Sequence, residues 1–233
     1  MIRTINANCL DVIQDFIKDG RKVDCIICDP PYEIVRINGG GTVNNIKKLN
    51  KSLQDLDKAN LVDGYDIETY NSLFVQIMKN INIYIWCNKK QIPKYFDFYV
   101  NRHKCKFDII CWHKTNALPT YSNKYLSDTE YCLYFRKGGN KCKPQSYEDA
   151  KTFYLSPLNQ KDKKLYNHPT IKPLELTKKF IRNSTERGDL VFDPFMGSGT
   201  TGVACKKLCR DFIGVELVSE YYTIAEDRIK VAE

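Results

Sequence analysis

The residues best suited to chemistry are Asp29, Pro30, Pro31 and Tyr32, which form the stretch D-P-P-Y directly after the apolar run 23–28. Two prolines fix the backbone, so one carboxylate and one aromatic ring project from a rigid corner. An acid, a proline carbonyl and an aromatic ring suit chemistry on the exocyclic amine of a nucleobase. Such an amine is a poor nucleophile because its lone pair is delocalised into the ring. Hydrogen bonds from that amine to the Asp29 carboxylate and the Pro30 carbonyl would localise the pair, while Tyr32 stacks on a base removed from the duplex. A sulfonium methyl held in line could then be attacked directly, without a metal.

A second motif, V-F-D-P-F-M-G-S-G-T-T-G at residues 191–202, has glycines at G-x-G-x-x-G spacing. That spacing alone is a weak signal, because the same loop can hold a dinucleotide, another adenosine cofactor or no ligand. A dinucleotide fold needs the loop near the start of its sheet, whereas here it lies near the C-terminus, which predicts a C-terminal cofactor half. Glu216, at the end of the next apolar run, stands where a carboxylate can accept hydrogen bonds from two ribose hydroxyls.

Both motifs must be positioned by strands and helices. Apolar runs predict strands at 23–29, 81–88, 107–113, 131–137, 189–195 and 211–217, and helical periodicity predicts helices over 9–19, 66–80, 173–186, 200–209 and 219–231. This alternation indicates an α/β fold, a single Rossmann-like domain over 1–233 with a mostly parallel twisted sheet and helices on both faces. Ligands bind at the carboxyl ends of such strands, so Asp29 and the glycine loop are expected to open into one crevice.

The charge is uneven. The chain has a formal net charge of +8, with lysines gathered in two polar segments: an insertion at 33–64 and a short basic segment at 137–170. Segments of that length are usually functional or disordered, so both are candidates for contacting a large partner. A basic surface suits a polyanion, although many basic faces are merely solvated. The lysines expected to contact phosphate are Lys47, Lys48, Lys51, Lys141, Lys143, Lys163 and Lys164.

The apolar runs are too short to cross a bilayer, and the N-terminal stretch lacks the pattern of a secretory signal, so a cytoplasmic location is expected. The ten cysteines fit a reducing compartment. Cys25 and Cys28 have C-x-x-C spacing, but residues three apart on a strand point to opposite faces, so no metal site is expected there. Cys205 and Cys209 are expected to share the buried face of a helix.

In this order, the motifs resemble those of the DNA amino-methyltransferases that use S-adenosylmethionine, in the group whose catalytic motif precedes the cofactor motif. The resemblance covers nearly the whole chain and implies that D-P-P-Y is catalytic, that S-adenosylmethionine is the cofactor and that the partner is double-stranded DNA. It also implies that Trp86, Trp112 and Lys114 lie near the target-base pocket, although core filling explains both tryptophans equally well. The implied cofactor-binding residues are Asn8, Cys9, Asp29, His168, Thr170, Lys172, Asp193, Pro194, Phe195, Gly197, Ser198, Gly199, Thr200, Thr201, Glu216 and Leu217.

Asn8 departs from the family, which has an acid at that position. The D-P-P-Y form is associated more often with adenine N6, and the S-P-P-Y form with cytosine N4, so the resemblance favours a site-specific adenine methyltransferase of a restriction-modification type. Cytosine N4 and RNA adenine remain alternatives. Two other classes are an NAD-binding oxidoreductase, which the short C-terminal half argues against, and a non-catalytic DNA-binding subunit, which Asp29 and Tyr32 disfavour. The resemblance also implies that the basic segment 137–170 is the candidate DNA-recognition region, and its short length fits a short target site, a homodimer or a partner subunit.

Overall fold

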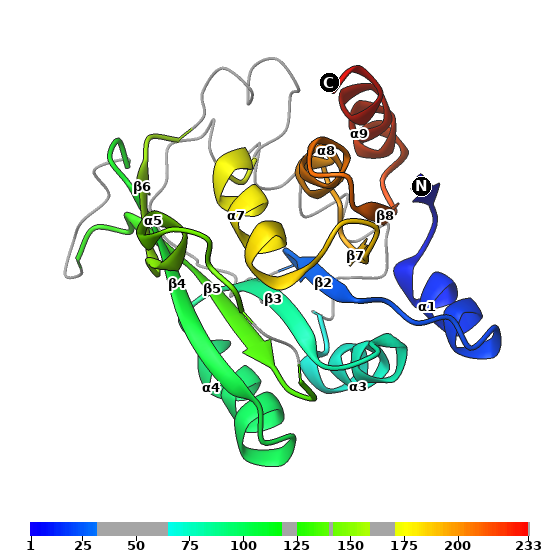
Figure 1. Ribbon diagram of the computed structural model, residues 1–233, viewed down its shortest axis with the longest axis horizontal. Helices are drawn as coiled ribbons and strands as arrows, with labels where there is room; N and C mark the ends of the chain where they lie inside the picture. Colours follow the sequence, from blue (N-terminus) through cyan, green and yellow to red (C-terminus); the bar gives the residue numbers. More distant parts are fainter. Residues whose placement is uncertain (32–64, 118–124, 140–141, 159–170, 233) are drawn as a thin grey trace, which may run out of the picture.

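The computed structural model describes residues 1–31, 65–117, 125–139, 142–158 and 171–232, and an eight-stranded sheet forms its centre (Figure 1). The strands lie in the order β1-β8-β7-β2-β3-β5-β4-β6. Their bounds are β1 Ile2–Asn6, β2 Cys25–Cys28, β3 Asn82–Cys87, β4 Lys106–Lys114, β5 Thr129–Arg136, β6 Phe153–Ser156, β7 Leu190–Asp193 and β8 Asp211–Glu216.

The sheet is mostly parallel. Only β5 runs against its neighbours β3 and β4, and every other pairing in the described sheet is parallel. From β2 the chain moves outward to β3, and from β7 it moves the opposite way to β8, so the winding reverses between the adjacent strands β7 and β2. Such a reversal opens a crevice at the carboxyl ends of the two strands, where ligands of α/β proteins bind.

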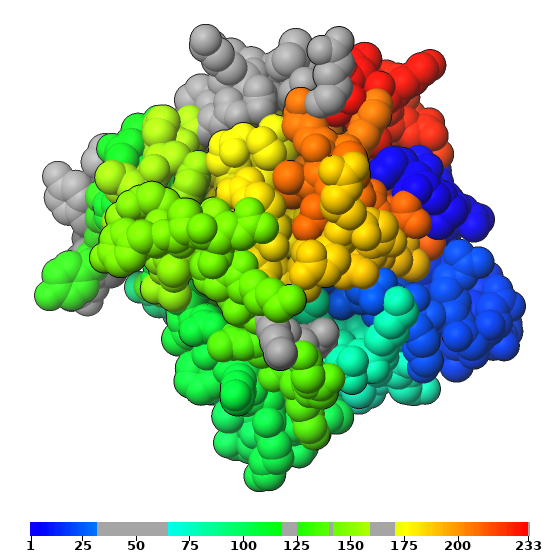
Figure 2. Space-filling view, viewed as in Figure 1, coloured from blue at the N-terminus to red at the C-terminus, as the bar shows by residue number. Residues whose placement is uncertain are grey.

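Helices cover both faces of the sheet. The first face packs against α1 (Cys9–Lys18), α3 (Ile67–Ile77), α4 (Ile92–Phe96) and the π-helix η1 (Asp97–Arg102). The second face packs against α7 (Leu174–Ser184), α8 (Thr200–Lys207) and α9 (Ser219–Val231), and Figure 2 shows α7 and α8 side by side in yellow and orange. The short α5 (Tyr147–Ala150) precedes the edge strand β6. The predicted fold class is thereby confirmed.

The two cysteines of the C-x-x-C stretch separate as the strand geometry predicts. Both lie on the fully buried β2, but Cys25 packs in the core under α7 and α8, whereas Cys28 packs in the core under α1 and α3. Their side chains point to opposite faces of the sheet, so the two thiols cannot share one ion.

Several elements differ from the sequence-based prediction. The edge strands β1 and β6 were not predicted, because they are half exposed and have no continuous apolar run. The prediction for Cys209 was wrong: α8 ends at Lys207, and Cys209 follows it with a left-handed φ of 57° and an exposed side chain. The insertion 33–64 lies outside the described residues, while 137–170 contributes α5 and β6 to the body of the protein. None of the helices in the described stretches is long and apolar enough to cross a membrane.

Candidate active site

Three acids lie at the carboxyl ends of three strands that are neighbours in the sheet. Asp29 follows β2, Asp193 ends the neighbouring β7, and Glu216 ends β8 beyond it. The paired residues Ile26 and Phe192 set the register of β2 against β7, which brings Asp29 to the same end as the glycine loop. The charge of Asp29 helps to raise the pKa of Asp193, so the two carboxyls interact. The described part of the D-P-P-Y corner and the glycine loop therefore lie at adjacent strand ends, as the sequence predicts.

The glycine loop has a backbone that requires glycine. Gly197 and Gly199 have φ values of 50° and 77°, a region that side chains disfavour. A Cβ on Gly202, inside α8, would lie 2.4 Å from the Cδ1 atom of Ile229 and 2.8 Å from the Cε1 atom of Phe212. The first two glycines therefore shape the turn, and the third allows α8 to pack closely on α9 and the sheet.

Asp193 holds this loop from within. Its carboxylate accepts a hydrogen bond of 2.6 Å from the Thr201 hydroxyl and one of 3.1 Å from the Phe195 amide. Burial raises the pKa of Asp193 to about 7, with a smaller contribution from the charges of Asp29 and Glu216, while its hydrogen bonds oppose the rise. Asp193 and Thr201 thus shape the loop that the sequence predicts to bind the cofactor.

Arg228 of α9 braces the same loop, and the sequence reasoning missed it. Its guanidinium Nη1 donates to the carbonyl and hydroxyl of Ser198 at 3.1 Å each and to the hydroxyl of Thr200 at 2.9 Å. The side chain is buried, although arginine is rarely buried unless its donors are satisfied. A lone arginine in the last predicted helix carries no local signal, because its partners lie about thirty residues upstream.

Glu216 is held in a fixed orientation. Its two carboxylate oxygens accept hydrogen bonds of 2.9 Å from the amides of Gly197 and Val218. Burial raises the pKa of Glu216, and these backbone amides counteract it. A carboxylate offers about four acceptor positions, so both oxygens can accept a further hydrogen bond each, as two ribose hydroxyls require.

The first turn of α1 lies beside this acid. The Ala7 amide donates to the Glu216 carbonyl at 3.2 Å, which joins the entry segment to the end of β8. Asn8 caps α1, because its side-chain oxygen accepts from the Leu10 amide at 3.0 Å. Cys9 is buried, and burial raises its pKa to about 12, so it acts as an apolar wall. Leu217 is partly buried directly after Glu216.

Asp29 is the first member of a chain of alternating charges. The Nζ atom of Lys172 lies 2.8 Å from Oδ2 of Asp29 and 2.9 Å from Oε2 of Glu130, at the start of β5. The other oxygen of Glu130 lies 2.6 Å from the Nζ atom of Lys114, at the end of β4. Burial opposes ionisation of Glu130, but the two ammonium groups hold its pKa below the usual range. Lys114 and Lys172 were expected at the site, and Glu130 was not.

The two tryptophans lie beneath this chain. Each is 2% exposed, their rings meet edge to face at 6.3 Å, and Trp112 donates to the Ser156 hydroxyl. The Lys172 ammonium stands 4.8 Å from the Trp86 ring and that of Lys114 5.4 Å from the Trp112 ring. Both tryptophans therefore fill the core, and they support the lysines above them by cation–π contact.

Several expected site residues lie outside the described residues, namely Tyr32, His168, Thr170, Lys47, Lys48, Lys51, Lys141, Lys163 and Lys164. Lys143 is described, and it is not at the carboxyl edge. Its amide donates to the Asn183 carbonyl at the C-terminal end of α7, and its ammonium faces Glu186 at 3.4 Å. Lys172 precedes the other end of α7, roughly 16 Å away for a helix of this length.

Lys89 and Lys90 lie at the carboxyl edge, directly after β3, and the sequence reasoning did not select them. Both are exposed, and the Lys89 ammonium stands 5.8 Å from the Tyr131 ring. The Asn88 side chain fixes their turn by accepting from the amides of Lys90 and Gln91. They follow the strand next to that of Asp29, so they extend the site toward β4.

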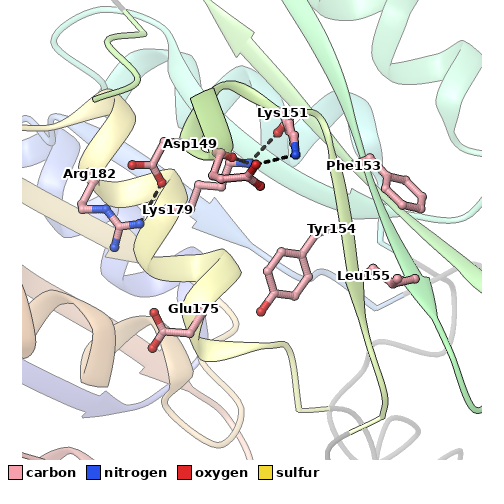
Figure 3. A pocket seen from close by; sticks show the side chains of 9 residues that line it. Asp149, Lys151, Phe153, Tyr154, Leu155, Glu175, Lys179 and Arg182 are labelled. Carbon is pink, nitrogen blue, oxygen red and sulfur yellow. Dashed lines mark hydrogen bonds and ion pairs between the residues drawn. The ribbon is translucent and has the colours of Figure 1, made fainter. Parts of the chain in front are cut away.

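A separate hollow of about 470 Å³ lies between α5, β6 and α7 (Figure 3). Its charges are satisfied internally: Arg182 bonds to Asp149 at 2.9 Å, and the Lys179 ammonium donates to the carbonyls of Glu148 and Lys151. These contacts fasten α5 to α7. No group of three or more His, Cys, Asp and Glu among the described residues is arranged to hold a metal ion, here or at the strand-end acids.

Comparison with known proteins agrees with this geometry. The family model described as "DNA methylase", of the N6/N4 type, matches residues 23–227. Type II methyltransferase M2.DpnII of Streptococcus pneumoniae is 31% identical over 229 residues, covering 89% of this chain and 82% of that protein. M2.MboI of Moraxella bovis is 29% identical over 247 residues, covering 95% and 85%.

Solved structures show the same architecture. M1.HpyAVI in its complex with S-adenosylmethionine superposes with a TM-score of 0.70 at 30% identity, covering 98% of this chain and all of that one. The cytosine-N4-specific PvuII DNA methyltransferase superposes with a TM-score of 0.72, covering 97% and 86%, but at 15% identity it bears on the fold alone.

The fold and its strand-edge site are those of a methyltransferase. The chain belongs to the N6/N4 DNA methylase family, and it is a DNA methyltransferase dependent on S-adenosylmethionine.

Proposed function

We propose that this methyltransferase modifies the exocyclic N6 amine of an adenine flipped out of double-stranded DNA. The observation that carries the proposal is the placement of Asp29 at the end of the strand adjacent to the glycine-loop strand, at the reversal of the sheet. An acid and a cofactor loop on neighbouring strand ends can face one another across a single crevice.

The D-P-P-Y corner acts on the amine. The Asp29 carboxylate is 26% exposed, so a base entering the crevice can reach it. One amine hydrogen donates to that carboxylate and the other to the Pro30 carbonyl, which draws the nitrogen toward tetrahedral geometry and frees its lone pair. Tyr32 stacks on the flipped base and fixes its plane. Positioning therefore supplies much of the rate.

The glycine loop, Glu216 and the first turn of α1 form the cofactor seat. S-adenosylmethionine, when bound, supplies a methyl group on a positively charged sulfur. Glu216 accepts hydrogen bonds from the two ribose hydroxyls of the cofactor, and the side-chain oxygen of Asn8 accepts one from the amine of the cofactor's adenine. The backbone of Gly197, which has no Cβ, gives the methionine portion close access, while Gly199 lets the turn pack closely against Ala225 of α9. The acids at this edge complement the positive charge of the cofactor.

Base identity is tested by nucleoside analysis. The protein is incubated with methyl-labelled S-adenosylmethionine and, in parallel reactions, with mixed-sequence duplex DNA or with RNA, and each nucleic acid is digested to nucleosides. We expect label in N6-methyladenine. Label in N4-methylcytosine would contradict the adenine assignment while leaving the amine chemistry intact, and label in RNA alone would contradict the DNA substrate. Sequencing that locates modified bases then gives the recognition sequence.

A further inference from the structure

We propose that Lys172, clamped by Glu130, is a positioning residue of methyl transfer: it holds the Asp29 carboxylate ionised and oriented toward the target amine. The resemblance to the family implies only that Lys172 lies near the cofactor. This inference rests on the proposed function of Asp29 as the acceptor of the amine.

The geometry around Lys172 is that of a built site. Its side chain is 10% exposed, and its ammonium lies within 2.9 Å of both Asp29 and Glu130 and over the Trp86 ring at 4.8 Å. Burial opposes the charge, yet the two carboxylates raise the pKa of Lys172 above its ordinary value. A buried ammonium with three kinds of partner has little freedom to turn, so it fixes the oxygen of Asp29 that it touches.

Asp29 needs such a partner because other acids lie close to it. The charges of Asp29 and Glu216 both contribute to the raised pKa of Asp193, which shows that these acids interact unfavourably. Stacking a base over the crevice would remove more water and favour a neutral Asp29. A neutral carboxylic acid is a poorer acceptor than a carboxylate, so it would draw the amine less strongly. Lys172 offsets both effects.

Glu130 acts through Lys172. It takes a second hydrogen of the ammonium and shares its other oxygen with Lys114, so the four charges from Asp29 to Lys114 alternate in sign. Without the Glu130 carboxylate, two lysines would face each other across a buried gap and Lys172 would lose its fixed direction. The two lysines and the two tryptophans beneath them thus keep the Asp29 carboxylate in one orientation.

Other titratable groups face Asp29 from every element packed around it. They are Lys172 before α7, Glu130 and Cys132 of β5, Cys28 of β2, Cys87 of β3, Tyr95 of α4 and Asp193 of β7. Burial raises the pKa of Cys28, Cys87, Cys132 and Tyr95, so these stay neutral at neutral pH. Asp193 titrates near neutrality and must be resolved separately from Asp29.

The first test reads the charge of Asp29 without any turnover. Carboxyl carbon resonances of labelled aspartates are followed by nuclear magnetic resonance through a pH titration, with Asp29 assigned by D29N and Asp193 by D193N. In Lys172→Met we expect the pKa of Asp29 to rise by about one unit or more, since an opposite charge at this range lowers a carboxyl pKa by roughly one to three units. In Glu130→Gln the pKa of Asp29 should be unchanged or lower, because a nearby negative charge is removed. An unchanged Asp29 titration in Lys172→Met would overturn the inference.

The second test reads catalysis. At saturating cofactor, Lys172→Met should lower kcat by about a hundredfold at neutral pH and shift the acid limb of the pH profile of kcat to higher pH. Lys172→Arg should keep that limb near its wild-type pH. Glu130→Gln should lower kcat without that upward move. Lys178→Met, in α7 and paired with Glu175, is the matched control and should behave as wild type.

Two outcomes distinguish a failure of this inference from a failure of the proposed function. If Lys172→Met weakens S-adenosylmethionine binding by calorimetry and leaves kcat at saturation unchanged, Lys172 is a cofactor ligand and the inference is wrong. If the wild-type protein methylates no DNA, the proposed function fails, and the Asp29 titration still decides the charge relation. Thermal unfolding of each variant shows whether the fold is retained, and Lys172→Gln, which also removes the charge, replaces Lys172→Met if that variant does not fold.

Discussion

The acidic side chains at the strand ends differ in role according to how deeply each is buried. Asp29 is partly exposed and is proposed to meet the substrate. Asp193 is only 4% exposed and is bonded to Thr201 and Phe195, so it acts inside the loop. Two aspartates in similar sequence settings, each following an apolar strand and preceding a proline, therefore have separate roles that burial decides.

Asp29→Asn tests the acid directly. The amide keeps the size of the side chain and one acceptor oxygen but loses the charge, so we expect kcat to fall by at least about a hundredfold, as for loss of a well-placed catalytic group. The affinity for S-adenosylmethionine, measured by calorimetry, should change by less. Asp128→Asn, directly before β5 and two residues from Glu130, is a control for an added amide near the edge. Wild-type turnover by Asp29→Asn would remove the acid from the mechanism.

Asp193→Asn tests the buried acid through stability. The pKa of Asp193 is raised from 3.8 to about 7, so the folded state binds a proton that the unfolded state has already released between those values. Stability from this group is therefore lost as pH rises toward 7. Relative to wild type, Asp193→Asn should gain roughly 2 to 3 kcal/mol in unfolding free energy between about pH 5 and about pH 8, measured by urea unfolding. A pH-independent difference would show that Asp193 is ionised throughout.

Helices at the cofactor half act as braces for backbone shape. The glycine loop has no regular hydrogen-bond ladder at Gly197 and Gly199, and its form depends on Arg228 of α9 behind it and on Glu216 of β8 in front. The close approach of α8 to α9 is possible because Gly202 has no side chain. The last helix thus braces, through Arg228, the loop that is proposed to hold the cofactor.

Arg228→Met tests the brace. It leaves the acceptors of Ser198 and Thr200 without their buried donor, so the unfolding free energy should fall by about 2 kcal/mol. The dissociation constant for S-adenosylmethionine should rise about tenfold, because the loop loses its fixed form. Both are measured by urea unfolding and calorimetry, with the exposed Lys230→Met on the same helix as control. A stability loss with unchanged cofactor affinity would limit Arg228 to a structural role.

Across the whole molecule, the carboxyl edge changes from acidic to basic. Asp193, Glu216 and Asp29 lie at β7, β8 and β2, whereas the exposed Lys89 and Lys90 follow β3, and Lys114 at the end of β4 is paired with Glu130. We expect the acids to lie near the cationic cofactor, and the ammonium groups of Lys89 and Lys90 to contact the phosphates of a bound duplex. Lys143, at the opposite end of α7, does not share that edge.

The double variant Lys89→Ala with Lys90→Ala tests the basic edge. Each phosphate contact contributes about 0.9 to the slope of log affinity against log salt concentration, so we expect the slope to fall by up to about two. Binding to all DNA sequences should weaken alike, as measured by fluorescence anisotropy at several salt concentrations. Lys143→Ala should leave the slope unchanged. The opposite ranking would move the DNA path to the amino edge.

The sequence by itself determined the D-P-P-Y corner, the glycine loop, Glu216 and the α/β alternation, because each is written in residues that are close along the chain. Only the tertiary structure placed Glu130 against Lys172, Arg228 behind Ser198, the tryptophans in the core and Lys143 away from the edge. These relations depend on strand order and register, since a shift of one residue sends a strand side chain to the other face of the sheet. No local pattern contains that information.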